Sequence, residues 1–289
     1  MQAGSPVNTY RHPHRGLPAG MFNSLANALM LARVRRAAMN YLPFPVLESD
    51  VRDVVYLTWM LDAEVVSPFV PAGVRLWQHE GQTPLTILTY AHRHFGPSRL
   101  GRLRSVCPSP LQSNWRLYVE ELPGGSPASR TVLFLKNIMN STLYALGTRV
   151  FSDALPTHLA SSFHHVCHGD MFSTQILGGR GSAPGLSYRG RLNEEKRLPA
   201  SFARAFGSWY SAVEFLGCQD AAITQVAGSA KLAYAQIDLP IDLELVRACS
   251  IQAESFECPF LQKLGASSDS AFGFVLPQVK FRAVSEMLI

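Results

Sequence analysis

The chain has 289 residues, of which 47% are hydrophobic and 16% are charged, and its 26 Lys and Arg against 21 Asp and Glu give a formal net charge of +5. Average soluble domains carry about 25% charged residues, so this composition excludes extended disorder and predicts a large core. The charge is too small and too dispersed for a nucleic-acid partner, which needs a basic patch or stripe. No run approaches the ~20 uninterrupted apolar residues of a transmembrane segment.

The cysteines and the N-terminal residues indicate the cellular setting. The cysteines are spread without a Cys-x-x-Cys pair, which argues against a structural zinc site and a disulfide scaffold. The first residues lack the apolar segment of a secretory signal. The sequence also lacks a phosphate loop, a Gly-x-Gly-x-x-Gly motif and a Gly-x-Ser-x-Gly motif. We therefore expect a cytoplasmic protein without a metal or other cofactor.

The N-terminal 45 residues are expected to precede the main domain. Residues 1–20, rich in Pro, Gly and His, predict a flexible arm, and residues 21–45 predict a helical segment with its helix over 24–40. Three arginines make this helix basic near its C-terminal end: Arg33, Arg35 and Arg36. Two interpretations stay open, because such a helix can pack on the body of the protein or make peripheral contact with a membrane.

From residue 50 onward the patterns are typical of strands. Residues 83–94 alternate with period two, which puts Tyr90, His92 and His94 on one face and Arg93 on the other. Residues 115–121 alternate in the same way and include Arg116. The apolar segment 130–138 predicts a strand buried on both sides, interrupted by Arg130, Lys136 and Asn137. Further strands are predicted over 223–226, 230–239 and 272–284, and helices over 140–152 and 201–216.

These elements predict the fold class. Strands outnumber helices and do not alternate regularly with them, which favours a mainly β (α+β) fold, an antiparallel sheet or barrel with appended helices. No internal repeat or linker interrupts residues 46–289, so we expect a single domain there.

Four segments resemble the acetoacetate decarboxylase-like superfamily. VVYLTWMLDAEVVSPFVPAGVRL (54–76) resembles the opening strand, short helix and turn of that family. Residues 140–160 resemble the family's helix and the motif that carries its catalytic lysine; their sequence is NSTLYALGTRVFSDALPTHLA. Residues 267–288 resemble the family's closing strand; their sequence is SSDSAFGFVLPQVKFRAVSEML. SFARAFGSWYSAVEF, from residue 201, is similar to an uncharacterised branch. The resemblance implies an antiparallel β-barrel around an apolar pocket, often in a homo-oligomer.

The resemblance also implies a change in chemistry. In the decarboxylase, the first lysine of a Pro-Lys-Lys-Leu run forms a Schiff base with a β-keto acid, and the second lowers its pKa. The matching run here is Pro156-Thr157-His158-Leu159, without either lysine. The alignment therefore excludes Schiff-base decarboxylation at the family position.

Other residues are candidates for catalysis or binding. Lys136 and Lys231 lie in predicted strands and would become nucleophiles if desolvated, although a lysine at a rim stays solvated. His158, His92 and His94 are candidates for acid–base catalysis, because the unperturbed pKa of histidine is near neutral. The candidate substrate-binding residues are Arg93 and Arg116, which would hold a carboxylate, with Tyr90, Thr157 and Lys231. Arg93 and His92 cannot both face inward from one regular strand.

The histidines at 164–168 give only weak support for a metal-binding site. His164 and His168 would share a face both on a helix and on a strand, and no second ligand group stands at a recognised spacing. We therefore expect no metal.

Two classes of function stay open. The first is a lyase-like enzyme (a lyase, dehydratase or cyclase) that binds a small or medium organic or keto acid and uses His acid–base chemistry. The second is a non-catalytic ligand-binding or scaffolding barrel, with peripheral membrane attachment as a further alternative. The sequence leaves open whether the protein is an enzyme at all.

Overall fold

The computed structural model describes residues 8–39 and 44–289. The strands are β1 (Leu47–Asp62), β2 (Arg75–Leu76), β3 (Gln82–Ala91), β4 (Gly96–Pro97), β5 (Leu111–Leu122), β6 (Ser126–Met139), β7 (Thr157–Leu159), β8 (Ser162–His168), β9 (Met171–Leu177), β10 (Leu186–Leu192), β11 (Ala221–Gln225), β12 (Leu232–Asp238), β13 (Arg247–Ile251) and β14 (Phe272–Leu288). The α-helices are α1 (Leu17–Ala26), α2 (Leu29–Met39), α3 (Ala63–Val66), α4 (Thr142–Phe151), α5 (Ala200–Phe206), α6 (Trp209–Gly217) and α7 (Pro259–Lys263). Short 3-10 helices are η2 (Ser67–Phe69), η3 (Ser98–Val106), η4 (Leu243–Leu245), η5 (Ala253–Ser255) and η6 (Ser268–Ser270).

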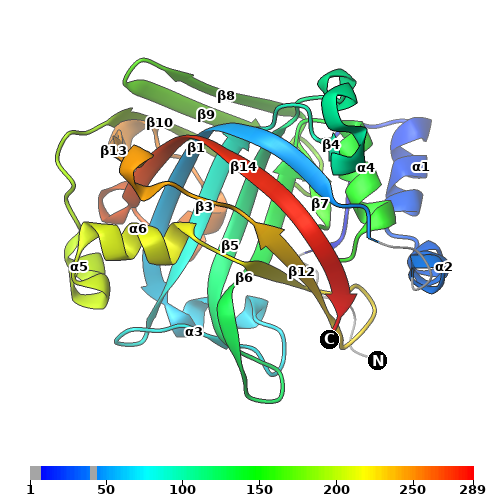
Figure 1. Cartoon of the computed structure of the whole chain (residues 1–289), viewed down its shortest axis with the longest axis horizontal. Helices are drawn as coiled ribbons and strands as arrows, with labels where there is room; N and C mark the ends of the chain where they lie inside the picture. The colour runs from blue at the N-terminus through cyan, green and yellow to red at the C-terminus, as the bar shows by residue number, and fades with distance from the viewer. Residues whose placement is uncertain (1–7, 40–43) are drawn as a thin grey trace.

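The strands form a sheet that closes on itself. Its order runs β1-β3-β5-β6-β11-β12-β14, and β14 pairs with β1 to complete a ring (Figure 1). From β14 the sheet also continues through β13, β10 and β9 to β8. The expected β-rich fold with appended helices is therefore confirmed.

The expectation of a purely antiparallel sheet was wrong. β6 runs parallel to β11 and also parallel to the short β7, so the sheet is mixed. The connection from β6 to β7 passes through α4, and such a crossover lets the next strand enter in the same direction. The antiparallel alternative would need a tight hairpin, which this sequence lacks between residues 139 and 157.

The predicted strands agree with the structure except at their ends. The patterns at 115–121, 130–138, 223–226, 230–239 and 272–284 fall on β5, β6, β11, β12 and β14. The pattern at 83–94 matches β3, which ends earlier, at Ala91. The alternation expected for His92, Arg93 and His94 therefore stops, and His94 has a left-handed φ of 53°.

Two predicted helices are each divided in the structure. The helix expected over 201–216 is interrupted at Gly207, whose φ is +71°, and Ser208 then caps α6 by accepting from the Ser211 N–H. The helix expected over 24–40 is divided between α1 and α2 near Asn27, whose side chain exchanges two hydrogen bonds with the Tyr10 backbone. Its last expected residue lies outside the described residues.

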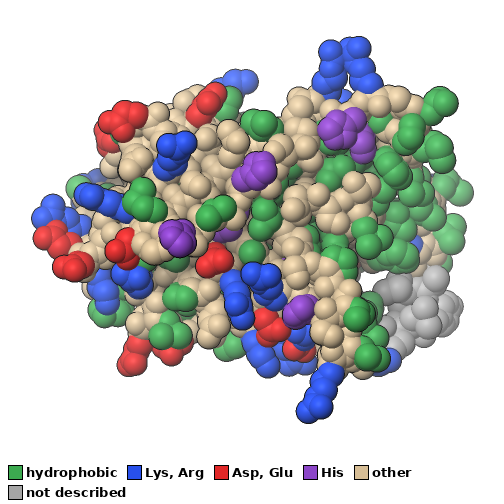
Figure 2. All heavy atoms as spheres, turned by 90° about the horizontal axis from the view of Figure 1, so that it is seen from above, with side chains coloured by type: hydrophobic (Ala, Val, Ile, Leu, Met, Phe, Trp, Pro, Cys, Tyr) green, Lys and Arg blue, Asp and Glu red, His purple; other side chains and the backbone are tan. Residues whose placement is uncertain are grey.

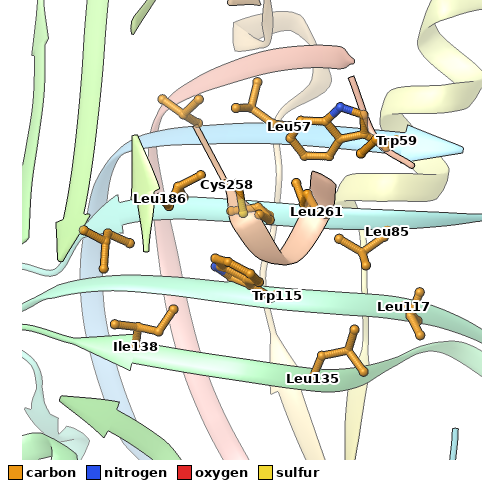
Figure 3. Close-up of a cluster of buried hydrophobic side chains, with 14 of the residues drawn as sticks. Leu57, Trp59, Leu85, Trp115, Leu117, Leu135, Ile138, Leu186, Cys258 and Leu261 are labelled. Atoms are coloured by element: carbon orange, nitrogen blue, oxygen red, sulfur yellow. The ribbon is translucent and has the colours of Figure 1, made fainter. Parts of the chain in front are cut away.

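Strands β1, β3, β5 and β6 are covered on both faces, as their near-continuous apolar runs predict. One face packs on α5, α6 and β14, through Tyr56, Tyr90, Tyr118 and Phe274 of the strands; we call it the α6 face. The opposite face packs on α7 and β8–β10, and Figure 3 shows its residues Leu57, Leu85, Trp115 and Leu135 beside Leu186 and Leu261; we call it the α7 face.

Helices α1, α2 and α4 lie together at one end of the molecule (Figure 1). α1 already begins at Leu17, inside the segment expected to be a flexible arm, and Tyr10 in that arm is only 2% exposed. Residues 1–7 of the expected arm lie outside the described residues. Apolar side chains gather on the surface over this end (Figure 2). No helix within the described parts of the chain is both long and apolar enough to cross a membrane.

Candidate functional site

The run that matches the family lysine motif forms β7, beside β6. Thr157 is fully buried on the α6 face, where its hydroxyl accepts from the Asn137 amide at 2.7 Å. The Thr148 hydroxyl of α4 lies 2.7 Å from the same oxygen. Thr157 is thus fixed by neutral hydrogen bonds to two elements.

His158 points to the other side of the strand, because successive side chains of a strand alternate. Its Nδ1 lies 2.6 Å from the Ser182 hydroxyl and its Nε2 lies 3.4 Å from Lys136 Nζ. The parallel register that pairs Ile138 with His158 brings the two side chains together across β6 and β7.

Positive charge surrounds this pair. Burial and, to a smaller extent, the nearby Arg149 guanidinium together lower the pKa of Lys136 to about 8. Burial also holds the pKa of His158 well below its usual range, with smaller contributions from Lys136 and Arg149. At neutral pH His158 is therefore neutral, and about one tenth of Lys136 is an unprotonated amine.

Arg149 is held in place by the backbone. It donates to the carbonyls of Asn8 at 2.8 Å, Pro156 at 3.2 Å, and Thr157. Its guanidinium lies over the Tyr10 ring, 5.1 Å from the centroid. Burial raises the pKa of the Tyr10 hydroxyl to about 12, so this neighbour is neutral and leaves the positive charge uncompensated.

The N-terminal arm covers His158. The Arg11 N–H donates to the Ser182 hydroxyl at 2.9 Å, and the Ser182 N–H donates to the Arg11 carbonyl at 3.0 Å. Gly181 is needed for this close approach, since a Cβ there would lie 2.9 Å from the Arg11 carbonyl oxygen. The arm and the loop that holds Gly181 and Ser182 together cover His158.

His92 belongs to a buried chain of hydrogen bonds on the α6 face. Its Nδ1 lies 2.8 Å from the Ser49 hydroxyl and its Nε2 lies 2.6 Å from Gln112 Oε1. The Gln112 amide donates to Asn137 Oδ1 at 2.6 Å, and Asn137 continues the chain to Thr157. Because Gln112 Oε1 accepts, His92 carries its proton on Nε2. Burial lowers the pKa of His92 to about 4, so it is a neutral member of this network.

Arg116 also lies on the α6 face, as the sequence pattern predicts for a residue that could hold a carboxylate. It is 3% exposed, donates to the Leu216 carbonyl at 2.6 Å and lies over the rings of Tyr56 and Tyr118. Burial raises the pKa of Tyr56 to about 12, so that hydroxyl is neutral. Within the described residues Arg116 forms no salt bridge, and its Nε and the neighbouring Asn114 Oδ1 have no hydrogen-bond partner. A buried guanidinium without a counter-ion suits a ligand carboxylate.

Three sequence candidates lie away from both clusters. Arg93 is exposed, His94 is half-buried beyond the end of β3, and Lys231 is exposed just before β12. Tyr90 does lie beside His92, 5.2 Å between ring centroids, and burial raises the pKa of its hydroxyl.

The histidine cluster at 164–168 lies on β8 and therefore follows the strand alternative. His164 and His168 are exposed, whereas the His165 ring bonds to the Thr174 hydroxyl and the Asp53 carbonyl. The described residues contain no group of three His, Cys, Asp or Glu placed to hold a metal ion.

Arg149, Ser182 and Gln112 were not predicted from the sequence. Arg149 had a usable signal, since it stands in the Gly-Thr-Arg run just before the Thr157-His158 motif. Ser182 is remote in sequence and contacts His158 only through the fold.

Comparisons with known proteins agree with this architecture. Residues 48–189, just under half of the chain, match a family described as an uncharacterised conserved protein, DUF2071. No curated protein sequence matches the chain.

Solved structures match nearly the whole chain. The enduracididine biosynthesis enzyme MppR is 12% identical with a TM-score of 0.56, covering 86% of this chain and 88% of that chain. An acetoacetate decarboxylase is 12% identical with a TM-score of 0.54, and the match covers 86% of this chain and 90% of that chain. An acetoacetate decarboxylase-like enzyme from Sphingomonas wittichii RW1 is 10% identical with a TM-score of 0.53, covering 85% and 94%. At such identities the likeness shows the fold. The chain therefore has the acetoacetate decarboxylase-like fold, and its residues 48–189 match the uncharacterised family DUF2071.

Proposed function

We propose that the protein is a lyase-like enzyme that binds a small keto acid at Lys136 and His158, away from the family position of the Schiff-base lysine. The observation that supports this is the 3.4 Å separation of Lys136 Nζ and His158 Nε2, in a buried site under the positive charge of Arg149. An amine with a lowered pKa is the form that attacks carbonyl carbons at neutral pH.

The chemistry would begin with Lys136. Its nitrogen lone pair adds to the substrate carbonyl carbon; one amine proton and one proton from solvent leave with the carbonyl oxygen as water, and the second amine proton stays on nitrogen, which gives a protonated imine. The protonated imine then draws electrons from the neighbouring C–C or C–H bond. Neutral His158 lies close enough to accept a proton from Lys136 and to return it to carbon. Water finally hydrolyses the imine, restoring the carbonyl and the free lysine.

The electrostatics favour an anionic substrate. Lys136 and Arg149 both carry positive charge near the reacting atoms, and Arg149 is bonded to carbonyls rather than to a carboxylate. A carboxylate on the substrate would compensate that charge. Among the solved relatives, MppR has been captured with pyruvate and with a condensation product of pyruvate and imidazole 4-carboxaldehyde. Those complexes support a keto acid as the first compound to test.

Substrate access would require the arm to move. The hydrogen bonds between Arg11 and Ser182 are exposed, so the arm would open at this point while the buried Tyr10 stays anchored. Closure of the arm over the bound substrate would then exclude water from the imine.

The test is borohydride trapping with pyruvate and acetoacetate, followed by intact-mass analysis and peptide mapping. We expect a reduced adduct on Lys136 that Lys136→Met abolishes. Lys231→Met is the matched control, because Lys231 is exposed and distant, and its adduct yield should equal that of the wild type. An adduct on another lysine, or none with any keto acid, contradicts the proposal.

A second candidate function rests on Arg116. Its buried guanidinium without a carboxylate partner suits a non-catalytic site for an organic acid on the α6 face. Calorimetric titration with the same acids would separate the two functions. Binding that survives Lys136→Met but is lost in Arg116→Gln, with no trapped adduct, favours the binding protein.

A further inference from the structure

We propose that the end of the molecule formed by α1, α2, α4 and η3 docks on an anionic membrane surface. These elements carry large apolar side chains that are each 62% to 88% exposed: Leu17, Met21, Met30, Val34, Leu103, Val106, Leu143 and Phe151. We call these residues the docking face. Monomeric soluble proteins rarely expose so much contiguous apolar surface without a use for it.

The exposed residues are arranged in a regular way. Leu17 and Met21 are one turn apart on α1, and Met30 and Val34 are one turn apart on α2, so each helix shows an apolar stripe to solvent. Both helices pack on α4. Phe95, which precedes β4 and η3, stacks on Tyr144 of α4, and this contact brings the segment that leads into η3 to the same end. Figure 2 shows hydrophobic side chains gathered on this side of the molecule, without acidic side chains among them on the visible face.

The charged residues within α1, α2, α4 and η3 are all arginines. The sequence up to residue 47 holds five arginines and no acidic residue, and α4 and η3 also lack Asp and Glu. Arg33, Arg99 and Arg102 are exposed, and within the described parts of the chain they form no salt bridge. Cations beside an apolar face match the composition of membrane-surface helices, where each basic residue adds attraction to anionic lipid.

Not every arginine of α2 faces solvent. Arg35 and Arg36 turn inward to the same carboxylate, that of Asp153, with Arg36 bonded at 2.7 Å and 2.8 Å. This double ion pair fixes α2 on the body and leaves Met30, Arg33 and Val34 outward. The docking face is therefore held rigidly before any membrane is met.

A hollow of about 600 Å³ lies at the beginning of α1, where Ala19, Gly20 and Asn23 of the helix line it. Its basic lining comes from Arg11, Arg15 and Arg180, with His14 beside them. A lipid headgroup phosphate fits this chemistry, and its acyl chains would then meet the apolar residues of α1.

A second copy of the chain is the less suitable occupant. Two-fold self-association brings the same patch onto itself. Because the face carries arginines and no acidic residues, that contact would set like charges against one another. An anionic lipid surface instead complements both the arginines and the apolar side chains.

The test is co-sedimentation of the full chain with phosphatidylcholine vesicles, with and without phosphatidylglycerol. We expect binding only to the anionic vesicles, weakened by salt. Met30→Glu with Val34→Glu should reduce the partition coefficient by more than about tenfold. Arg33→Gln and Arg102→Gln should each reduce it by about fivefold. The matched control is Val166→Glu with Leu245→Glu, which changes two exposed apolar residues elsewhere and should leave binding unchanged.

Three results would overturn the proposal. One is the absence of sedimentation with anionic vesicles beyond that of neutral vesicles. Another is equal loss in the docking-face variant and the control variant. The third is a light-scattering measurement in which Met30→Glu with Val34→Glu dissociates an oligomer while vesicle binding is unaltered, which would assign the face to a second copy.

Discussion

Thr157 and His158 are consecutive in β7, yet their side chains lie on opposite faces of the sheet. Thr157 joins a neutral chain of hydrogen bonds on the α6 face, whereas His158 meets Lys136 and Ser182 on the other. In the alignment that the sequence resemblance implies, the two lysine positions are therefore separated by the backbone. The proposed chemistry uses the second of them, with a lysine supplied by the neighbouring strand.

Replacing Thr157 with valine should destabilise the protein by about 1–3 kcal/mol. The change keeps the shape but leaves the Asn137 amide without its buried acceptor, whereas the Thr148 hydroxyl still has the Tyr144 carbonyl at 2.9 Å. Urea denaturation measures the loss. Thr157→Ser retains the hydroxyl and is the control; equal destabilisation by both substitutions would show that packing rather than hydrogen bonding matters here.

Trapping at Lys136 should increase with pH and reach half of its maximum near the pKa of about 8. The reason is that only the unprotonated amine attacks the carbonyl. Arg149→Gln removes a neighbouring cation and should move the midpoint to higher pH. Adduct formation against pH, measured by mass spectrometry, gives both curves. A midpoint near the ordinary lysine pKa in the wild type would show that Lys136 is not desolvated.

The lowered pKa of Lys136 also makes the free energy of unfolding depend on pH. The folded pKa of Lys136 is depressed, so between about pH 8 and the unfolded value of 10.5 the unfolded chain binds more protons. Stability from this group therefore rises with pH across that window. Lys136→Met should remove this rise.

His92 should make the protein sensitive to acid. Its folded pKa of about 4 lies below the unfolded value of 6.5, so stability is full above 6.5 and is lost as the pH falls toward 4. Between neutral pH and about pH 5 the expected loss from this group is about 2 kcal/mol. Urea denaturation of the wild type and of His92→Gln at both pH values separates the contribution of His92 from those of His158 and His165. An equal pH dependence in both proteins would contradict the prediction.

Asp153→Asn should release α2. The Asp153 carboxylate, whose pKa its arginine partners lower, binds both Arg35 and Arg36 and is only 10% exposed. Its neutralisation leaves two buried guanidinium groups uncompensated, a loss of about 3–5 kcal/mol for a buried pair. Hydrogen exchange should accelerate in α2 and in the C-terminal turn of α4. Asp170→Asn, in an exposed pair with Arg247, is the control and should leave exchange unchanged.

Local patterns were sufficient to predict much of the sheet. β5, β6 and β14 follow from alternating or continuously apolar runs, since a strand's burial depends on its own residues. The boundary of β3 could not be predicted in this way, because His92 leaves the ladder to bond with the Pro110 carbonyl. The parallel pairing of β6 with β7 and β11 depends on the crossover through α4 and on ring closure, which no single segment records.

The candidate site was predicted in part. Lys136 was recognised as a polar residue in an apolar strand, Arg116 as a possible carboxylate ligand in an alternating strand, and His158 from its place in the run that resembles the family lysine motif; all three lie in buried clusters. That Lys136 meets His158 could not be predicted, because their approach depends on the register between β6 and β7. Arg93 and Lys231 were included as charged residues of predicted strands, but both lie just outside the ends of β3 and β12, where such residues are most often solvated.

The ring has a consequence for biosynthesis. β1 holds its place through pairing with β14, and these partners are separated by more than two hundred residues of chain. A nascent chain that has already made β1, β3, β5 and β6 still presents the free edge of β1 until β14 leaves the ribosome. An open apolar edge strand is a template for aggregation. The protein should therefore depend on a chaperone that shields this edge during translation.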